Sequence, residues 1–346
     1  MKRSFMFICA AALLLTGCGA SADEASAQLF AMDTVMQLDA YGHQVKQAVS
    51  DAEETIQALE ARLSRTREDS LVSVLNQNGA AQDLSAAEQA LLSEALTFRD
   101  ATGGAFDITI APVMDAWGFT GDSYRVPAQD ELDALLENVN SDEIRLSGSS
   151  VTLGAGQAID LGGIAKGYTS DCVEAIFREN EVESGKISLG GNVFVLGGKP
   201  DGADWRVGIR DPQDENALAA VLTLRDAYAI TSGGYERYFT ENGNTYHHII
   251  DPSTGYPADS GLLSVTVVAE ANGPDFSGPG NGTMCDAFST ALFVMGEERA
   301  LEFWQTGGYD FDLVLVTADG RVIITDGLSD RFEVVKDSGY TYETVS

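Results

Sequence analysis

Residues 159–167 constrain this chain more than any other segment, because they place a carboxylate, two adjacent glycines and a lysine just before an amphipathic helix. Glycine lets other groups approach the main chain without a Cβ in the way, and a helix N-terminus offers unpaired N–H groups to an anion. Asp160, Gly162, Gly163 and Lys166 therefore predict a tight turn at the start of a helix. Such a turn suits a phosphorylated ligand, and equally a strand-to-helix connection without a ligand.

The N-terminus has the pattern of an export signal. Two basic residues precede an apolar run, residues 5–15, that is too short to span a bilayer as a stable helix. The run ends at Leu15-Thr16-Gly17-Cys18, which is typical of a lipoprotein cleavage box. We expect residues 1–17 to be removed and Cys18 to carry lipid, so that the protein is anchored to the membrane outside the cytoplasm. An ordinary secretory signal would also export the chain.

The rest of the chain divides into a short linker and one folded region. Residues 18–28 are predicted to be the acylated cysteine followed by a flexible tether, because the segment 21–28 is small, polar and acidic. Residues 29–346 are long enough for one large domain and are expected to carry the function.

The chain is strongly acidic, with 53 Asp and Glu against 21 Lys and Arg and a formal net charge of −32. Loss of residues 1–17 would make this −34, since it removes two positive charges and no negative one. An acidic surface repels nucleic acid and anionic lipid headgroups. We therefore exclude nucleic acid as a partner and expect any anionic ligand to need a local cation.

Cysteine and histidine usage argues against a disulfide framework or a zinc site. After processing and lipidation, Cys172 and Cys285 would remain, and two buried free thiols are favoured over a disulfide. The sequence has no Cys-x-x-Cys spacing, and its three histidines are too few for a histidine-rich metal site.

Helix and strand patterns are mixed without strict alternation, which favours an α+β fold over a doubly wound parallel sheet. Apolar spacing predicts helices at 45–63, 85–103, 130–136, 165–177, 286–295 and 299–304. Strands are expected at 36–41, 144–153, 187–189, 193–196, 205–209, 220–224, 227–231, 246–250, 263–268, 313–317 and 322–324. A loop is expected around Pro112 and Trp117, and a mobile surface loop at 272–282.

Three further segments contain groups that can do chemistry. Ala105-Phe106-Asp107 ends in a carboxylate that by itself favours capping of local main chain. His247 and His248 end a predicted strand before the turn Asp251-Pro252-Ser253-Thr254-Gly255, and a histidine there is either a surface residue or an acid–base group.

Asp286, Ser289 and Thr290 form the third segment. In a helix these residues share one face, because their spacing is i, i+3 and i+4. Three oxygen donors on one face suit Mg²⁺. The alternative is Asp286 as a helix N-cap, with both hydroxyls bonded to main-chain carbonyls.

Taken in order, these segments resemble the ApbE family, the bacterial FAD:protein FMN transferases. The resemblance extends from residue 32 to about residue 327 and rests on short landmarks in a fixed order. The landmarks are Met32-Asp33-Thr34, Ala105-Phe106-Asp107, residues 160–167, Leu189-Gly190-Gly191-Asn192, Ser232-Gly233-Gly234, residues 248–255 and residues 286–290. The resemblance implies an ApbE-like α+β fold, related to the T-fold, in which helices pack on mixed sheets.

The resemblance also implies an activity. Enzymes of this family bind FAD and cleave its pyrophosphate with Mg²⁺. They attach the FMN part by a phosphoester to a threonine of an exported acceptor protein, and AMP leaves. The acceptors belong to membrane electron-transfer complexes.

Site residues follow from the matching positions. The resemblance implies that FAD contacts Met32, Ala105, Phe106, Asp107, Asp160, Lys166 and Ile250, with Lys166 near the diphosphate. It implies that Mg²⁺ is held by Asp286 and Thr290, with Ser289 and the carbonyl of Gly163. The threonine must lose a proton as it attacks, and His248 is the candidate base because its ordinary pKa lies near neutral pH. A carboxylate could do the same work.

Two departures from the family pattern stand out. This chain has extra residues at 272–282, and it has Thr66 where some relatives place an aromatic residue. Two other functions remain open: an FAD pyrophosphatase that uses water as acceptor, and a flavin-binding lipoprotein without catalysis. The presence of Asp286, Thr290 and His248 argues against the second, because a binding protein needs neither metal nor base.

Overall fold

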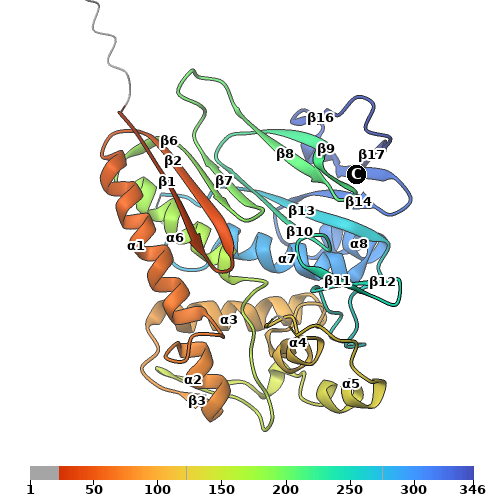
Figure 1. Ribbon diagram of the computed structural model, residues 1–346. Helices are drawn as coiled ribbons and strands as arrows, with labels where there is room; N and C mark the ends of the chain where they lie inside the picture. The colour runs from red at the N-terminus through yellow and green to blue at the C-terminus, as the bar shows by residue number, and fades with distance from the viewer. Residues whose placement is uncertain (1–22, 122, 275) are drawn as a thin grey trace, which may run out of the picture.

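The computed structural model describes residues 23–121, 123–274 and 276–346 (Figure 1). Its largest sheet has nine strands in the order β1-β2-β6-β7-β10-β13-β14-β15-β17. Neighbours run antiparallel, except that β15 and β17 are parallel. The strands are β1 (Asp23–Ala31), β2 (Thr34–Gly42), β6 (Val182–Leu189), β7 (Asn192–Leu196), β10 (Ala227–Gly233), β13 (Leu262–Glu270), β14 (Asp312–Thr317), β15 (Arg321–Thr325) and β17 (Thr341–Val345).

Both faces of this sheet are covered, which explains why its central strands are apolar without alternation. In β14, Leu313 and Leu315 pack into the core beneath the helices, while Val314 and Val316 pack into a second core. The second core lies under a three-stranded sheet made of β8 (Trp205–Asp211), β9 (Asp214–Leu224) and β16 (Phe332–Val334). The period of two along a strand thus divides the side chains between two layers.

Four helices cover the other face: α1 (Val45–Leu63), α6 (Ala165–Glu179), α7 (Asn281–Met295) and α8 (Glu297–Thr306). Helix α7 packs on β10 and β13, and α6 lies between α1 and α7. Most residues of α7 are buried, so its sequence is apolar nearly all round rather than amphipathic. This burial gives Asp286, Ser289 and Thr290 a fixed place in the core.

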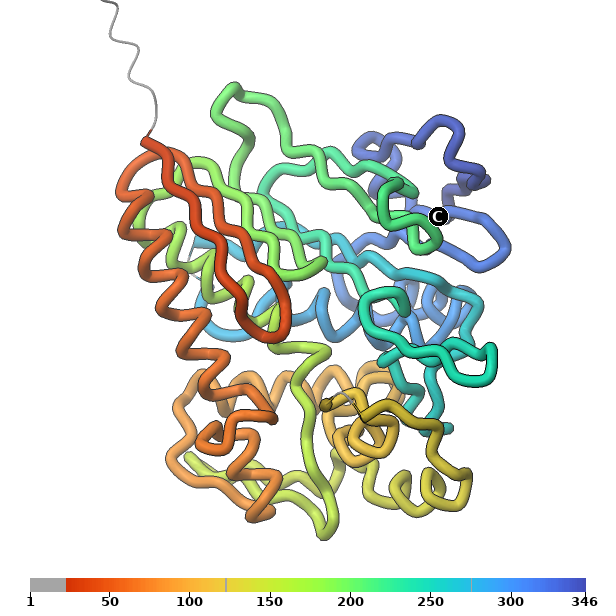
Figure 2. The backbone as a smooth tube through the Cα atoms, in the orientation of Figure 1, coloured from red at the N-terminus to blue at the C-terminus, as the bar shows by residue number. Residues whose placement is uncertain are grey.

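A smaller helical part lies at one end of the molecule, below the large sheet in Figure 1. It contains α2 (Leu71–Asn78), α3 (Ala86–Ala101), α4 (Ala111–Trp117), α5 (Gln129–Leu136) and a sheet of β3 (Ala80–Ala81), β4 (Arg145–Ser147) and β5 (Ser150–Thr152). Short 3₁₀ turns lie at Ile108–Ile110, Ser141–Glu143 and Asp326–Leu328. Strands β11 (Tyr238–Glu241) and β12 (Asn244–His247) form a separate two-stranded sheet. In Figure 2 the chain returns from this part into α6 through the yellow-green segment 153–164.

The structure confirms most predicted helices and strands. In the N-terminal half of the chain it corrects two predictions, at residues 23–28 and around Pro112 and Trp117. The loop expected around Pro112 and Trp117 is helix α4 instead. Proline fits there because it occupies the first turn, where its missing N–H has no intrahelical partner. The ring nitrogen of Trp117 donates to the carbonyl of Gly255 at 2.7 Å. The predicted tether is wrong for residues 23–28, which pair with β2 along strand β1.

Two corrections concern the C-terminal half. The 272–282 segment is not simply a mobile loop, because Asn272 is buried and hydrogen-bonded and α7 already begins at Asn281. Asp286 therefore lies in the second turn of α7 and is not its N-cap, although the hydroxyls of Ser289 and Thr290 do bond to a main-chain carbonyl, as the alternative expected. Strand β12 ends at His247 rather than continuing to Ile250.

The remaining expectations on the chain's ends and cysteines have mixed outcomes. Cys172 and Cys285 are free, as predicted, but only Cys285 is buried, while Cys172 is half-buried. In the part of the chain that the structure describes, every helix is too short or too polar to cross a membrane. Cys18 and the predicted signal peptide lie outside the described residues.

Candidate active site

Helices α6 and α7 cross in close contact at a pair of glycines, and this crossing builds the site. A Cβ added to Gly167 would lie 2.2 Å from the carbonyl oxygen of Gly282 and 2.6 Å from the Cβ of Asp286. The main-chain N–H of Gly167 donates to the Asp286 carboxylate at 2.8 Å. A glycine is needed at position 167 because a side chain would drive the two backbones apart.

Gly163 lies just before Ile164, the N-cap of α6, so its carbonyl is outside the helical hydrogen-bond ladder. A Cβ on Gly163 would lie 3.3 Å from Thr290 Oγ1 and 3.3 Å from the ring of Phe106. The start of α6 is therefore in contact with the α7 face that carries Asp286 and Thr290, through Gly163 at Thr290 and Gly167 at Asp286.

A group of hydroxyls continues this arrangement onto strand β10. Ser232 Oγ lies 2.8 Å from Ser289 Oγ and 3.2 Å from Thr290 Oγ1. Ser289 and Thr290 also donate to the carbonyl of Asp286, at 2.9 and 3.3 Å. Ser289 is fully buried. Its hydroxyl lies between that carbonyl and Ser232, and its role as a metal ligand stays a prediction.

These donors fit Mg²⁺ better than a transition metal. The set contains one carboxylate, one hydroxyl and one carbonyl, all hard oxygen donors, and Mg²⁺ commonly takes few protein ligands and completes its shell with water or phosphate. Within residues 23–121, 123–274 and 276–346, no three His, Cys, Asp or Glu side chains cluster as a metal site. One oxygen of the Asp286 carboxylate accepts from the N–H of Gly167, and Asp286 is buried, with 3% of its surface exposed.

Asp160 is held by a cation that sequence reasoning missed. Its Oδ1 accepts from the N–H of Gly162 at 2.7 Å, which forms the predicted turn. Its Oδ2 accepts from Arg65 at 2.9 Å, and the other nitrogen of Arg65 donates to Asp115 at 2.8 Å. Arg65 follows α1 in a polar stretch that carries no motif, so nothing local in the sequence singles it out.

The positive charge of Lys166 acts on His248. Lys166 lies in the first turn of α6 and makes no salt bridge with the described acidic residues, which leaves its charge available to an anion. Loss of contact with water, together with the positive charges of Lys166 and Arg237, lowers the pKa of His248 to about 4. His248 Nδ1 lies 3.2 Å from the carbonyl of Arg237. A carbonyl only accepts, so Nδ1 carries the proton and Nε2 keeps its lone pair.

His247 has a different, structural position, which separates the two histidines. Its Nε2 lies 3.1 Å from the carbonyl of Ala258, and its ring meets Phe293 of α7 edge-on at 5.4 Å. Burial lowers its pKa as well. His248 is therefore the histidine placed beside Lys166.

Met32 is presented at the tip of the β1–β2 hairpin. Met32 and Asp33 both have positive φ, at 48° and 61°, as a two-residue hairpin turn requires. The N–H of Met32 donates to Glu60 of α1 at 3.1 Å, and its sulfur lies 3.6 Å from Thr169 Oγ1 on α6. The hairpin tip thus reaches α6 near Lys166.

Two residues predicted to contact FAD also make contacts within the protein. Oδ1 of Asp107 accepts from the N–H and hydroxyl of Thr109 and from the hydroxyl of Ser141, at 2.5–2.8 Å. Asp107 therefore caps local main chain, as its position before a turn favours, and its contact with FAD stays a prediction. Ile250 is 6% exposed and packs in a small core beside Trp117. Ala105 and Phe106 are buried, with Phe106 against Gly163.

The sequence of this chain matches a known protein family and several of its members. A profile of the ApbE family matches residues 32–312. The chain belongs to the ApbE family. An FAD:protein FMN transferase of Treponema pallidum is 33% identical over 312 residues, which cover 84% of this chain and 83% of that protein. A protein of the same name from Vibrio cholerae is 28% identical over 329 residues, covering 92% of this chain and 95% of its own.

Solved structures of the ApbE family have the same fold. The ApbE protein of Thermotoga maritima is 30% identical, with a TM-score of 0.78 over 91% of this chain and 97% of its own. The flavinyl transferase ApbE of Pseudomonas stutzeri, in its apo form, is 25% identical, with a TM-score of 0.75 over 87% of this chain and 93% of its own. These matches confirm the ApbE-like α+β fold predicted from the sequence.

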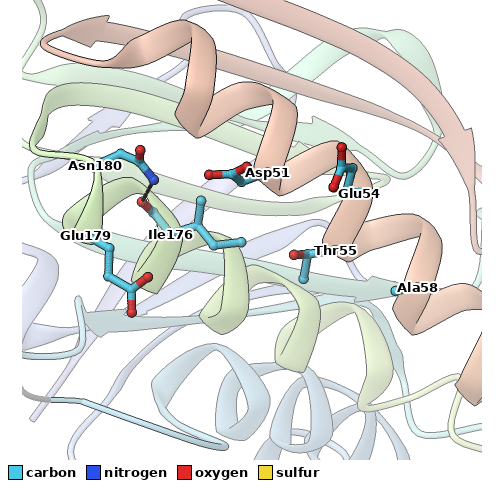
Figure 3. Close-up of a pocket in the computed structure, with 7 residues that line it drawn as sticks. All are labelled: Asp51, Glu54, Thr55, Ala58, Ile176, Glu179 and Asn180. Atoms are coloured by element: carbon cyan, nitrogen blue, oxygen red, sulfur yellow. Dashed lines mark hydrogen bonds between the residues drawn. The ribbon is translucent and has the colours of Figure 1, made fainter.

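One hollow of this ApbE protein lies away from the α6–α7 crossing. Figure 3 shows it between α1 and α6, with a volume of about 490 Å³. Asp51, Glu54 and Glu179 line it. Three carboxylates would repel the diphosphate of FAD, so we do not assign the flavin to this hollow.

Proposed function

We propose that this FAD:protein FMN transferase of the ApbE family cleaves the pyrophosphate of FAD with Mg²⁺ and attaches FMN to a threonine of an exported acceptor protein, releasing AMP. The observation that supports the proposal is the contact of the start of α6 with α7, where Gly163 lies against Thr290 and the N–H of Gly167 donates to Asp286. Oxygen donors at this contact, with Lys166 in the same turn of α6, are the kinds of group that transfer of a charged phosphoryl group requires.

The chemistry needs little covalent help from the protein. The acceptor hydroxyl attacks the phosphorus of the FMN half, the bridging P–O bond breaks, and AMP leaves with that oxygen. Bound Mg²⁺ would neutralise charge on the phosphates. Lys166 contributes a second positive charge that an otherwise acidic protein lacks. Alignment of the two reacting groups and this neutralisation account for catalysis in reactions of this class.

His248 is the proposed base for the acceptor threonine. Because Nδ1 is bound to the carbonyl of Arg237, Nε2 is the nitrogen able to accept the proton. With a pKa near 4 in the free protein, His248 is neutral and ready to act throughout the neutral range. Binding of the anionic diphosphate beside it would raise this pKa and improve it as a base.

The pH dependence tests this assignment. We expect kcat/KM, which reports the free enzyme, to stay level from about pH 7 to about pH 5 and to fall toward pH 4 as His248 becomes protonated. The pKa of His248 in the folded protein lies below the value of about 6.5 in the unfolded chain, so between these two values the unfolded chain binds more protons. The free energy of unfolding therefore also falls as the pH is lowered from about 6.5 to about 4. The measurement is the initial rate of transfer against pH, with His248→Asn and His247→Asn compared. An acid limb unchanged in His248→Asn would remove His248 from the mechanism.

Mass spectrometry of the acceptor tests the activity itself. The purified protein is incubated with FAD, Mg²⁺ and an exported FMN-binding domain. We expect an FMN adduct on a threonine together with an equal amount of AMP. Lys166→Met should lower the rate by on the order of a hundredfold, because one charge on the diphosphate is lost, while the distant Lys336→Met should leave it unchanged. Free FMN and AMP without an adduct would indicate an FAD pyrophosphatase, and intact FAD would contradict both.

The proposed location follows from the N-terminal sequence and not from the fold. Cys18 as a lipid-bearing residue would hold the enzyme at the outer side of the membrane, where exported acceptors are found. Labelling of growing cells with an alkyne fatty acid should mark the wild-type protein and not Cys18→Ser.

A further inference from the structure

Asp171, in the middle of α6, accepts five hydrogen bonds although it is fully buried. Three come from main-chain N–H groups at the start of α7, those of Gly280, Gly282 and Thr283, at 2.8–2.9 Å. The others come from the hydroxyl of Thr283 at 2.5 Å and the amide of Asn272 at 2.7 Å. All five partners donate, so this site is built for a carboxylate acting only as an acceptor.

This carboxylate is the N-terminal cap of α7, supplied by another helix. The first N–H groups of a helix have no partner within it, and α7 has no capping side chain of its own. A negative charge at that end is also favoured by the helix dipole. Burial raises the pKa of Asp171, and the five donors counter this by stabilising its ionised form.

The two helices cap one another. Asp171 of α6 binds the first turn of α7, and Asp286 of α7 binds the N–H of Gly167 in the first turn of α6. Between these links, Gly167 and Gly282 are in close contact. A slide of α7 along α6 would break bonds at both links at once. The relative position of the two helices is therefore fixed more firmly than packing alone would fix it.

A second buried carboxylate provides an internal contrast. Glu174, one turn after Asp171, accepts from the hydroxyl of Tyr228 at 2.5 Å and from the side-chain amide of Asn272 at 2.9 Å. It belongs to the same network, but it makes no hydrogen bond to α7. Burial raises its pKa too.

We propose that Asp171 is a positioning residue for the Mg²⁺ site, because it fixes the distance of Asp286 and Thr290 on α7 from the carbonyl of Gly163 at the start of α6. The inference rests on the proposed function, in which these three groups bind Mg²⁺. Mg²⁺ requires near-ideal octahedral geometry, so a small displacement of α7 lowers affinity. Asp171 itself does not touch metal or substrate.

Direct binding of Mn²⁺, followed by electron paramagnetic resonance, tests the proposal. In Asp171→Asn one side-chain N–H group faces the N–H donors of α7, so α7 is displaced. We expect its Mn²⁺ affinity to fall about 10- to 100-fold, as for groups that orient metal ligands. Glu174→Gln removes a buried charge from the same network and should stay within about twofold of wild type. FAD binding in metal-free buffer should be equal in all three proteins.

The outcomes separate the two hypotheses. Mn²⁺ binding by wild type but unchanged binding by Asp171→Asn would overturn the positioning role. Equal loss in Asp171→Asn and Glu174→Gln would overturn it too, because the effect would then be general loosening of the network. Absence of Mn²⁺ binding by wild type would instead overturn the metal site of the proposed function. If Asp171→Asn does not fold, Thr283→Val is the second test, because it removes the hydroxyl that donates to Asp171. A loss of Mn²⁺ affinity of about threefold or more would support the positioning role, and unchanged Mn²⁺ affinity would contradict it.

Discussion

Replacement of Asp286 by Asn should abolish Mg²⁺-dependent transfer while the protein stays folded. Asn keeps the shape of the side chain and an oxygen for the N–H of Gly167, but it removes the only carboxylate among the proposed ligands. Loss of groups that merely orient a ligand costs about 10- to 100-fold, so loss of this ligand should cost at least on the order of a hundredfold. The rate of adduct formation measured at rising Mg²⁺ concentration tests this.

Asp312→Asn is the matched control for the Asp286 variant. Asp312, on β14, is also partly buried and accepts from the hydroxyl of Thr325 at 2.6 Å, but it belongs to the far side of the sheet. It should lose some stability and keep its rate per folded molecule. A transfer rate for Asp286→Asn within about threefold of wild type would remove this residue from the proposed metal site.

Replacement of Gly167 by Ala should have the largest effect on stability. The new Cβ would lie 2.2 Å from a main-chain oxygen of α7, and main chain cannot move aside as a flexible side chain can. Overpacking of a core typically costs about 1–3 kcal/mol, and a main-chain clash at a helix crossing belongs at the upper end of that range. Urea unfolding, which gives the change in midpoint at constant slope, is the measurement.

Gly121→Ala supplies the control, because a Cβ at that position meets no atom within 4 Å and the glycine does not have positive φ. It should leave the free energy of unfolding unchanged to within about 0.5 kcal/mol. The Gly167 variant should also lose Mn²⁺ affinity, since its clash pushes α7 away from Gly163. A stable Gly167→Ala protein with wild-type metal binding would mean that the helices do not depend on this close contact.

Local signals in the sequence predicted individual elements well. Helix α3 begins at Ala86, close to the predicted start at residue 85, and a capping box of Ser85 and Glu88 fixes this start. The glycine turn at Asp160 leads into α6, and Asp286 and Thr290 share a face of one helix. These features depend on neighbours within a few residues, which a sequence pattern records directly.

Predictions failed where distant residues decide the outcome. Residues 23–28 are polar and small like a linker, yet β2 offers them an edge to pair with, so they form a strand. Asn272 lies in a segment rich in Gly, Pro and Asn, yet the buried carboxylates of Asp171 and Glu174 hold it in place.

The sequence by itself determined which chemical groups the protein has and in what order: a glycine turn with Lys166, a histidine after a strand, and an aspartate with hydroxyls on one helical face. Only the tertiary structure decided that Gly167 and Asp286, 119 positions apart, meet across a helix crossing, and that Arg65 holds Asp160 from 95 positions away. The physical reason is that such contacts arise from packing two helices on one sheet. That packing depends on the whole core rather than on the residues that touch.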